Sequence, residues 1–336
     1  MTTSVYKSNL ITLDEFIIEA QRKFPQATGE LSQLLRDITL ACRIIADEAN
    51  YNVQREMRSR QSGQKFDRLE YLRKFAVEQF RFALDRSGMV SRVITAFSSG
   101  PLNMSSSTGK YMVALHPIEG IPNMAYNTSA ATVFGIYKTN PEQPADEQTL
   151  LQPGKNLIAS GYVLYGSSTM LVFTTAGLGV NFFTLDHEVG DFFLSRRNIK
   201  IPDDAPMYSC NTGWEYLMDQ QDQSVLEYFR ANSFKGDPYR FRYIGSLSAD
   251  MHRILLEGGI FLYPKNKNSP EGRLNLIYEC APVAFVMEQA GGVATDGKQR
   301  ILDKLPDKID AKSPFYAGSP ALMRRVGQVR DGKAPA

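Results

Sequence analysis

The hydrophobic pattern of this chain changes once, near residue 110, and that change limits the possible folds more than any other feature. Between Leu31 and Ile45 the apolar residues recur every three or four positions, and a similar pattern runs from about Asp67 to Leu84. This spacing predicts two helices that each bury one face. From Tyr111 onward the apolar residues instead form short runs, which are typical of buried strands. The chain is therefore expected to have an α/β fold whose layers begin with helices and continue with sheet.

The rest of the chain alternates between strand-like and helix-like segments. Strands are expected at 111–115, 132–137, 157–163, 169–174, 180–185, 192–194, 242–244 and 259–263. Helices are expected at 214–229, 249–256 and 282–288, the last of which starts with proline and is followed by a Gly-Gly pair. A polar, proline-containing stretch over 141–153 predicts a boundary between an N-terminal unit, 1–145, and a C-terminal unit, 146–336.

Charge and cysteine content exclude several classes of protein. The 38 basic and 36 acidic residues leave a net charge of +2, which argues against a general attraction to nucleic acid or acidic membranes. Cys42, Cys210 and Cys280 stand far apart, so neither a zinc site nor a disulfide framework is indicated. The chain shows no signal-peptide pattern and no apolar stretch long enough to span a bilayer. A cytoplasmic location without a nucleic-acid or membrane partner is expected.

Several long blocks of sequence point to one family. They read FGIYK (134–138), LLQPGKNLIASGYVLYGSSTMLV (150–172), YSCN (208–211), RYIGSLSADMHR (242–253) and SPEGRLNLIYECAP (269–282). In these blocks, and over roughly residues 10–328, the chain resembles the class I fructose-1,6-bisphosphatases. The resemblance implies an αβαβα sandwich, a homotetramer, a role in carbohydrate metabolism and gluconeogenesis, and a hydrolase that uses divalent metal ions such as Mg²⁺.

The motif that should hold those metals is degenerate. Where the family has DPxDGSSN, this chain reads His116-Pro117-Ile118-Glu119-Gly120-Ile121-Pro122-Asn123. The family's Glu-Glu pair aligns near 97–100, where no acid remains, and the GDxxxKLD motif retains Glu70 in place of its second aspartate. Of the family's acids, Glu279 is unchanged. The resemblance therefore implies catalytic remnants at Glu70, Glu119 and Glu279, and a metal site reduced to Glu119, Glu279 and His116.

These substitutions weaken the reacting end of the site in two ways. Imidazole is a poor ligand for Mg²⁺ and suits Zn²⁺ or other transition metals better. In the family, the Gly-Ser-Ser of the loop surrounds the phosphate that is cleaved, whereas here Ile121 has no hydroxyl and Pro122 has no N–H to donate. A tightly bound Mg²⁺, Mn²⁺ or Zn²⁺ ion is not expected.

Two other ligand sites of the family are retained. The residues that bind its non-reacting phosphate match Asn211, Tyr243, Tyr263 and Arg273, and Arg242 matches an arginine that reaches in from a neighbouring subunit. Such donors suit a phosphate dianion. The residues that bind AMP match the start of an N-terminal helix, where the phosphate would meet free N–H groups. These matching residues are Thr28, Gly29, Glu30, Leu31, Ser32, Lys110 and Tyr111.

Three functions remain open at this point. The first is an impaired or inactive homologue, a pseudoenzyme, that binds a ligand like fructose 6-phosphate, or AMP, and acts as a regulatory or assembly subunit. It would form a homotetramer or a mixed oligomer with an active paralogue. The second is an active fructose-1,6-bisphosphate 1-phosphatase with an altered site that uses Zn²⁺ or Mn²⁺. The third is a structural role without a ligand.

Overall fold

The first layer of the protein is helical. The computed structural model describes residues 10–22, 29–61, 67–98, 100–106, 108–139 and 147–333, without the side chains of 50–61 and 147–148. The layer contains α1 (Leu13–Arg22), α2 (Glu30–Gln61) and α3 (Arg68–Arg86). Helix α3 begins after Asp67, whose carboxylate accepts the first free N–H groups of the helix. Both helices expected from the apolar spacing are confirmed. The Ser62-Gly63 pair between them, a sequence typical of a loop, lies outside the described residues.

The second layer is an eight-stranded sheet with the order β2-β1-β3-β4-β5-β6-β7-β8. Its strands are β1 (Val90–Thr95), β2 (Leu102–Asn103), β3 (Tyr111–Glu119), β4 (Ala130–Lys138), β5 (Leu157–Tyr165), β6 (Thr169–Thr175), β7 (Val180–Asp186) and β8 (Asp191–Ile199). Strands β4 and β5 pair antiparallel along nearly their whole length. The boundary expected at residue 146 therefore falls between two paired strands of one sheet. The short helices α4 (Ile121–Met124) and α5 (Glu147–Leu150) lie in the β3–β4 and β4–β5 connections.

The second half of the chain forms the remaining layers around a five-stranded sheet with the order β12-β9-β13-β17-β15. The strands of the second half are β9 (Met207–Cys210), β10 (Ser233–Phe234), β11 (Asp237–Pro238), β12 (Arg240–Phe241), β13 (Ile260–Tyr263), β14 (Leu274–Asn275), β15 (Val293–Thr295), β16 (Lys312–Ser313) and β17 (Phe315–Gly318). Its α-helices are α6 (Gln220–Ala231), α7 (Leu247–Glu257), α8 (Ala281–Gln289) and α9 (Pro320–Arg330). The 3₁₀ turns are 154–156, 212–217 and 301–303.

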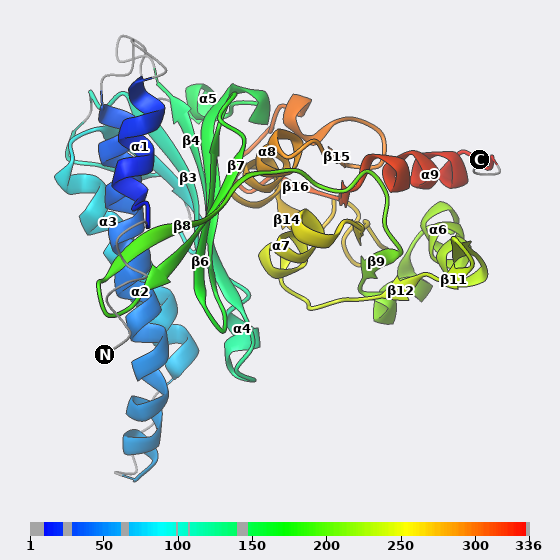
Figure 1. The fold of residues 1–336 in the computed structure, drawn as a ribbon, viewed down its shortest axis with the longest axis horizontal. Helices are drawn as coiled ribbons and strands as arrows, with labels where there is room; N and C mark the ends of the chain where they lie inside the picture. Colours follow the sequence, from blue (N-terminus) through cyan, green and yellow to red (C-terminus); the bar gives the residue numbers. More distant parts are fainter. Residues whose placement is uncertain are drawn as a thin grey trace.

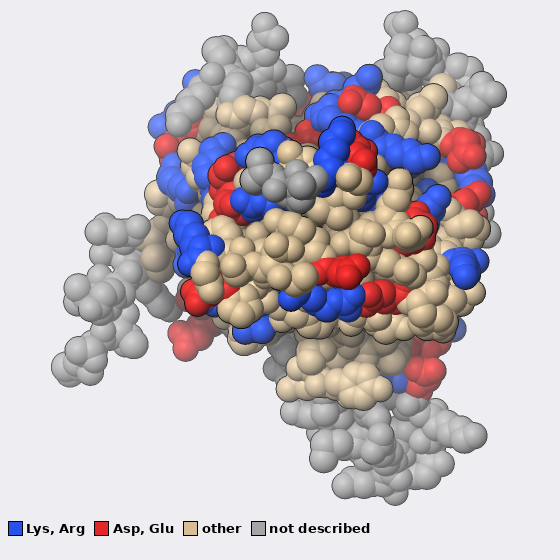
Figure 2. Space-filling view, turned by 90° about the vertical axis from the view of Figure 1, so that its right-hand side faces the viewer, with Lys and Arg blue, Asp and Glu red and all other residues tan. Residues whose placement is uncertain are grey.

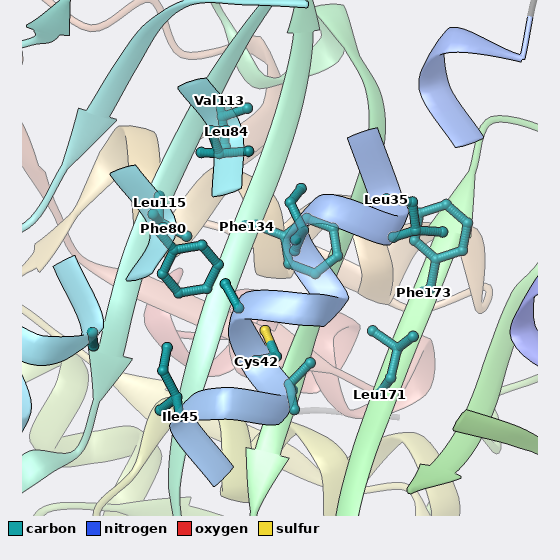
Figure 3. Packing of buried hydrophobic residues seen from close by; sticks show 14 of the residues in the cluster. Leu35, Cys42, Ile45, Phe80, Leu84, Val113, Leu115, Phe134, Leu171 and Phe173 are labelled. Carbon is teal, nitrogen blue, oxygen red and sulfur yellow. The ribbon is translucent and has the colours of Figure 1, made fainter. Parts of the chain in front are cut away.

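The elements stack along the longest axis of the molecule. Figure 1 shows α1–α3, the first sheet, α7 and α8, the second sheet, and then α6 and α9 in that order. The buried apolar residues form three clusters that lie between successive layers. Figure 3 shows the first cluster, where side chains of α2 and α3 meet side chains of β3, β4 and β6. The layers therefore have the order expected for an αβαβα sandwich.

Inner strands of the first sheet, such as β3 and β4, are apolar on both sides, and both sides are covered. In β3, Val113 and Leu115 face α2 and α3, whereas Met112 and Ala114 face the central helices. Burial on both faces explains why these segments read as continuous apolar runs rather than alternating ones.

Two predicted elements have different boundaries in the structure. The helix expected over 214–229 is a 3₁₀ turn followed by α6, because Asp219 is extended and its carboxylate accepts the Asp222 N–H as an N-cap. The strand expected at 242–244 lies earlier, at β12. The N–H groups of Ile244 and Gly245 instead donate to the carboxylate of Asp250.

The surface at the end of the molecule that carries α6 and α9 has mixed charge. Figure 2 shows basic and acidic side chains next to one another on this face. Several pairs in this half of the chain are in direct contact, including Arg230 with Glu215 and Arg325 with Asp204. Within the described ranges, no helix is both long enough and apolar enough to cross a bilayer.

A largely buried histidine between the layers predicts a dependence of stability on pH. His252 of α7 stacks on Phe182, with ring centroids 4.9 Å apart, and its Nδ1 lies 3.0 Å from the Tyr162 hydroxyl. Burial, with a smaller contribution from Arg196, lowers the pKa of His252 to about 4. Below about pH 6.5 the unfolded chain binds a proton that the folded chain does not bind, so stability falls as the pH falls.

We expect the free energy of unfolding to fall by about 2 kcal/mol between about pH 8 and pH 5 because of His252. Urea unfolding of the wild type and of His252→Gln at both pH values checks this, because other titrating groups cancel in the double difference. An equal pH dependence of the two proteins would contradict the prediction.

Candidate functional site

The loop after β3 carries the first part of the degenerate motif. The β3–β4 register shifts between His116 and Glu119, and β3 ends at Glu119. Gly120 then adopts φ +73°, a left-handed conformation that glycine adopts without strain. The Asn123 N–H closes a turn onto the Gly120 carbonyl, 2.9 Å away. Because Pro122 lies inside this turn without an N–H, the loop lacks one of the donors that an anion cradle would use.

The carboxylate of Glu119 is buried and engaged by the start of α7. Its Oε2 accepts the Ser246 hydroxyl at 2.8 Å and the Ser248 N–H at 3.4 Å, and its Oε1 accepts the Leu247 N–H at 3.1 Å. Glu119 is only 7% exposed. Burial raises the pKa of Glu119 above its usual value, although the Ser246 hydrogen bond and the His116 charge oppose this.

Glu279 lies on a π-helical turn, Leu276–Cys280, that joins β14 to α8. The Asn275 N–H donates to its Oε2 at 2.6 Å, and His116 Nδ1 lies 3.2 Å from its Oε1. Burial alone would raise the pKa of Glu279. The hydrogen bond and charge of His116, together with the Asn275 N–H, lower the pKa below its usual value. Both oxygens of Glu279 are thus in contact with polar groups of the protein.

An aromatic ring packs against His116, and an arginine packs against that ring. Phe97 adopts φ +72°, and its ring packs edge-on against His116 with centroids 5.4 Å apart. The guanidinium of Arg73 lies 4.9 Å from the centre of the Phe97 ring. Arg73 also pairs with Glu70 at 2.8 Å, and Lys74 lies 3.4 Å from the same carboxylate. Glu70 is therefore engaged on α3 and does not join Glu119 and Glu279.

These residues do not fit the magnesium that the resemblance implies. Mg²⁺ requires several free carboxylate or water oxygens in octahedral geometry. Here the carboxylates of Glu119 and Glu279 both accept protein hydrogen bonds, and the remaining neighbour is an imidazole. In the described ranges, no group of three or more His, Cys, Asp or Glu side chains is arranged to hold a metal ion.

The residues expected to bind the non-reacting phosphate lie together on the second sheet. Asn211 follows the end of β9, Tyr263 is the last residue of β13, and Arg273 lies beside them in a small pocket. Tyr243 is a neighbour of Tyr263 and of Asn211, which donates a hydrogen bond to it. Burial and then Tyr263 raise the pKa of Tyr243, and the Asn211 hydrogen bond opposes the shift. The enclosed space among these side chains is only about 10 Å³, so a ligand would lie on the open side, where Arg273 is exposed.

Local geometry holds Arg273 in this position. The preceding Gly272 has φ +93°, and a Cβ there would lie 2.2 Å from the Ser313 carbonyl carbon. On its other side the Arg273 guanidinium stacks on Trp214, 4.3 Å from the ring centre. Trp214 was not predicted as a site residue. It is the single tryptophan of the chain and follows Asn211 by three positions, which is the signal that could have indicated its role.

Arg242, which was expected to act in a neighbouring subunit, does not join this pocket. Its side chain is exposed, and its guanidinium donates to the Phe241 carbonyl at 2.9 Å. Exposure leaves it able to reach a second chain.

A larger cavity, about 630 Å³, lies between α1, the start of α2 and the first sheet. Six of the residues expected to bind AMP line it, namely Gly29, Glu30, Leu31, Ser32, Lys110 and Tyr111. The seventh, Thr28, lies outside the described residues. Lys110 Nζ pairs with Glu30 Oε1 at 2.5 Å. Most of the other lining residues are apolar, including Phe16, Ile158 and Phe173.

Known proteins resemble the chain over nearly its whole length. The family models described as fructose-1-6-bisphosphatase, N-terminal domain and C-terminal domain, match residues 11–197 and 201–331. They meet where the chain leaves β8 for β9. "Fructose-1,6-bisphosphatase class 1 2" of Salinibacter ruber is 38% identical over 343 residues, covering 96% of this chain and 92% of the relative.

Solved structures support the same similarity. Leishmania major fructose-1,6-bisphosphatase in holo form has a TM-score of 0.86 at 30% identity, covering 95% of this chain and 99% of that one. Its T-state structure has a TM-score of 0.87 at 30% identity, covering 96% and 99%. The layered α/β fold predicted from the sequence is confirmed.

Proposed function

Because this chain belongs to the fructose-1,6-bisphosphatase family, we propose that it binds a sugar phosphate and hydrolyses sugar bisphosphates poorly or not at all. One observation carries the proposal. Both oxygens of Glu119 and both oxygens of Glu279 are in contact with donor groups of the protein itself. A hydrolytic metal site needs those lone pairs for the ions that activate water and neutralise developing charge.

The residues expected to bind the non-reacting phosphate support binding of a sugar phosphate. Arg273, Asn211, Tyr243 and Tyr263 supply a guanidinium, an amide and two hydroxyls, which suit a phosphate dianion. Titration of the purified protein with fructose 6-phosphate, followed by calorimetry and by Trp214 fluorescence, tests this. Saturable binding at millimolar concentration or below is the expected result. No binding in that range would refute the proposal and favour a structural role.

We infer a regulatory or assembly role, because the residues of the metal site are degenerate while those of the phosphate pocket are retained. The family resemblance implies a tetramer, and the exposed Arg242 is free to reach the phosphate pocket of another copy or of an active paralogue. Light scattering gives the mass of the protein alone and after mixing with an active relative. If this protein elutes at a monomeric mass both alone and in the presence of the relative, this role is refuted.

We also propose that the 630 Å³ cavity binds AMP. The apolar lining suits an adenine ring, and the first N–H groups of α2 together with Lys110 suit its phosphate.

Two substitutions should change AMP binding in opposite directions. Lys110→Gln should weaken binding about tenfold, because it removes a charged phosphate donor. Glu30→Gln should strengthen it, because the substitution removes a negative charge and the ion pair that holds Lys110. Calorimetric titration of both variants with AMP checks this, with the distant Lys298→Gln as a control. Equal affinity in both variants would contradict the assignment.

A second candidate function is an active bisphosphatase that uses Zn²⁺ or Mn²⁺. The observation that favours it is the contact between His116 and Glu279, since imidazole and carboxylate are ligands that these metals accept. Metal analysis of protein purified without chelator, combined with an assay of phosphate release from fructose 1,6-bisphosphate, distinguishes the two candidate functions. Stoichiometric metal and metal-dependent turnover would favour the active enzyme.

A further inference from the structure

The segment from Arg242 to Ser248, which leads from β12 into α7, carries Tyr243 of the phosphate site. Side chains from other parts of the chain hold the first half of this segment by hydrogen bonds. The Arg242 carbonyl accepts from Arg253 at 3.0 Å, and the Gly245 carbonyl accepts from the Asn123 amide at 3.3 Å. The Ile244 and Gly245 N–H groups donate to the buried carboxylate of Asp250 at 3.1 and 3.2 Å.

Glu119 holds the second half of this segment by hydrogen bonds. It comes from the end of β3, in the first sheet, and accepts from Ser246, Leu247 and Ser248. These are donor groups at the N-terminus of α7, a helix of 11 residues. The first N–H groups of a helix have no partner within the helix, and a carboxylate there also interacts favourably with the helix dipole.

Solvent has little access to Glu119 and its donors. Glu119 is 7% exposed, while Ser246 and Ser248 are 1% and 0% exposed. If the carboxylate were removed, buried donors would lose their acceptor, and the segment would have to move to satisfy them.

The length of the side chain explains why the residue is a glutamate. The family motif has aspartate at this position, and glutamate is longer by one methylene group, about 1.5 Å. The extra length carries the carboxylate from the end of β3 to the start of α7. Those helix donors then use three of the roughly four acceptor sites of the carboxylate, which leaves it a poor metal ligand.

We infer that Glu119 is a positioning residue that holds the Arg242–Ser248 segment, and with it Tyr243, in its phosphate-binding geometry without a metal ion. The inference rests on the proposed sugar-phosphate binding, and it gives the residue expected to be a catalytic remnant a different role. Ligand binding is then independent of divalent metal and requires an acceptor, not a charge, at position 119.

Four substitutions test this role. In a fructose 6-phosphate titration followed by Trp214 fluorescence, Glu119→Gln should bind more tightly than Glu119→Ala, because its amide oxygen still accepts from Ser246 and Ser248, although its NH₂ group cannot accept the Leu247 N–H. Glu119→Ala has no acceptor and Glu119→Asp is too short, so each should weaken binding about tenfold or more. Glu257→Ala, at the exposed far end of α7, is the matched control and should bind normally. Each titration is run with Mg²⁺ and with EDTA, which should give the same affinity.

The opposite pattern would overturn the inference. If Glu119 held a metal, EDTA would weaken binding in the wild type, and the Gln variant would bind as poorly as the Ala variant. Equal affinity in the wild type and in both the Ala and Asp variants would also overturn it.

Hydrogen exchange separates failure of this inference from failure of the proposed function. The amides of residues 242–248 should exchange faster in Glu119→Ala than in the wild type or Glu119→Gln, with no ligand present. Unchanged exchange in the Ala variant would refute the role of Glu119. If the wild type binds no fructose 6-phosphate, the proposed function fails, and the exchange result still decides whether Glu119 holds the segment.

Discussion

The purified protein should release phosphate from fructose 1,6-bisphosphate at least about 10³-fold more slowly than an active member of its family assayed beside it. The result should hold with Mg²⁺, Mn²⁺ and Zn²⁺ alike. The reason is the arrangement at the reacting end. The carboxylates of Glu119 and Glu279 are engaged by protein donors, and the segment 97–100, which the resemblance aligns with two further acids, contains none. Each lost electrostatic group typically costs two to three orders of magnitude in rate, as a rough guide.

Restoring the family loop alone should not restore this rate. The variant His116→Asp, Glu119→Asp, Ile121→Ser, Pro122→Ser recovers the motif but leaves the Phe97 ring in place. It also removes the glutamate that fastens α7. We expect turnover to rise only when Phe97→Glu is added, because that substitution returns an acid and removes the ring that packs on position 116. Turnover by this five-residue variant but not by the wild type would identify the loop and Phe97 as the cause of the loss.

Metal-dependent turnover by the unmodified protein would contradict the proposal. In that case His116 and Glu279, which are already in contact, would be the first residues to test as ligands of Zn²⁺ or Mn²⁺. Stoichiometric metal in the purified protein would support the same conclusion.

The elements of the fold could be predicted where one physical pattern dominated. Seven apolar positions of α2 share one face, and strands β3 and β4 are apolar on both sides because layers cover both sides. The helix around residue 214 was misplaced because its boundary depends on one local contact, the Asp219 carboxylate on the Asp222 N–H. Apolar spacing does not report such a contact.

The site was harder to predict, because its chemistry depends on partners that are distant in sequence. Resemblance identified Glu119 and Glu279 by their positions in two motifs. It could not show that Ser246, 127 residues away, engages the first, or that His116, 163 residues away, contacts the second. Those contacts decide whether a carboxylate is a free ligand or a structural acceptor. Trp214 was missed for the same reason, since its stacking on Arg273 exists only in the folded chain.

Arg273 should be the dominant residue for sugar-phosphate binding. Its exposed guanidinium is fixed in direction by Gly272 on one side and by Trp214 on the other. A guanidinium held in place loses little entropy when it forms two parallel hydrogen bonds to a phosphate. Arg273→Ala should therefore weaken fructose 6-phosphate binding about 100-fold, or about 2.7 kcal/mol.

A lysine at position 273 distinguishes the contribution of charge to ligand affinity from that of the planar guanidinium. Arg273→Lys keeps the charge but loses the planar fork and the stacking on Trp214, so it should weaken binding about tenfold. Calorimetry is the suitable measurement, because either substitution changes the environment of Trp214 and therefore its fluorescence. Arg300→Ala, which removes an arginine paired with Glu288, is the control and should bind as the wild type does. Wild-type affinity in Arg273→Ala would place the ligand elsewhere, and the AMP cavity would then be the next site to test, since a phosphate ester could bind at the start of α2.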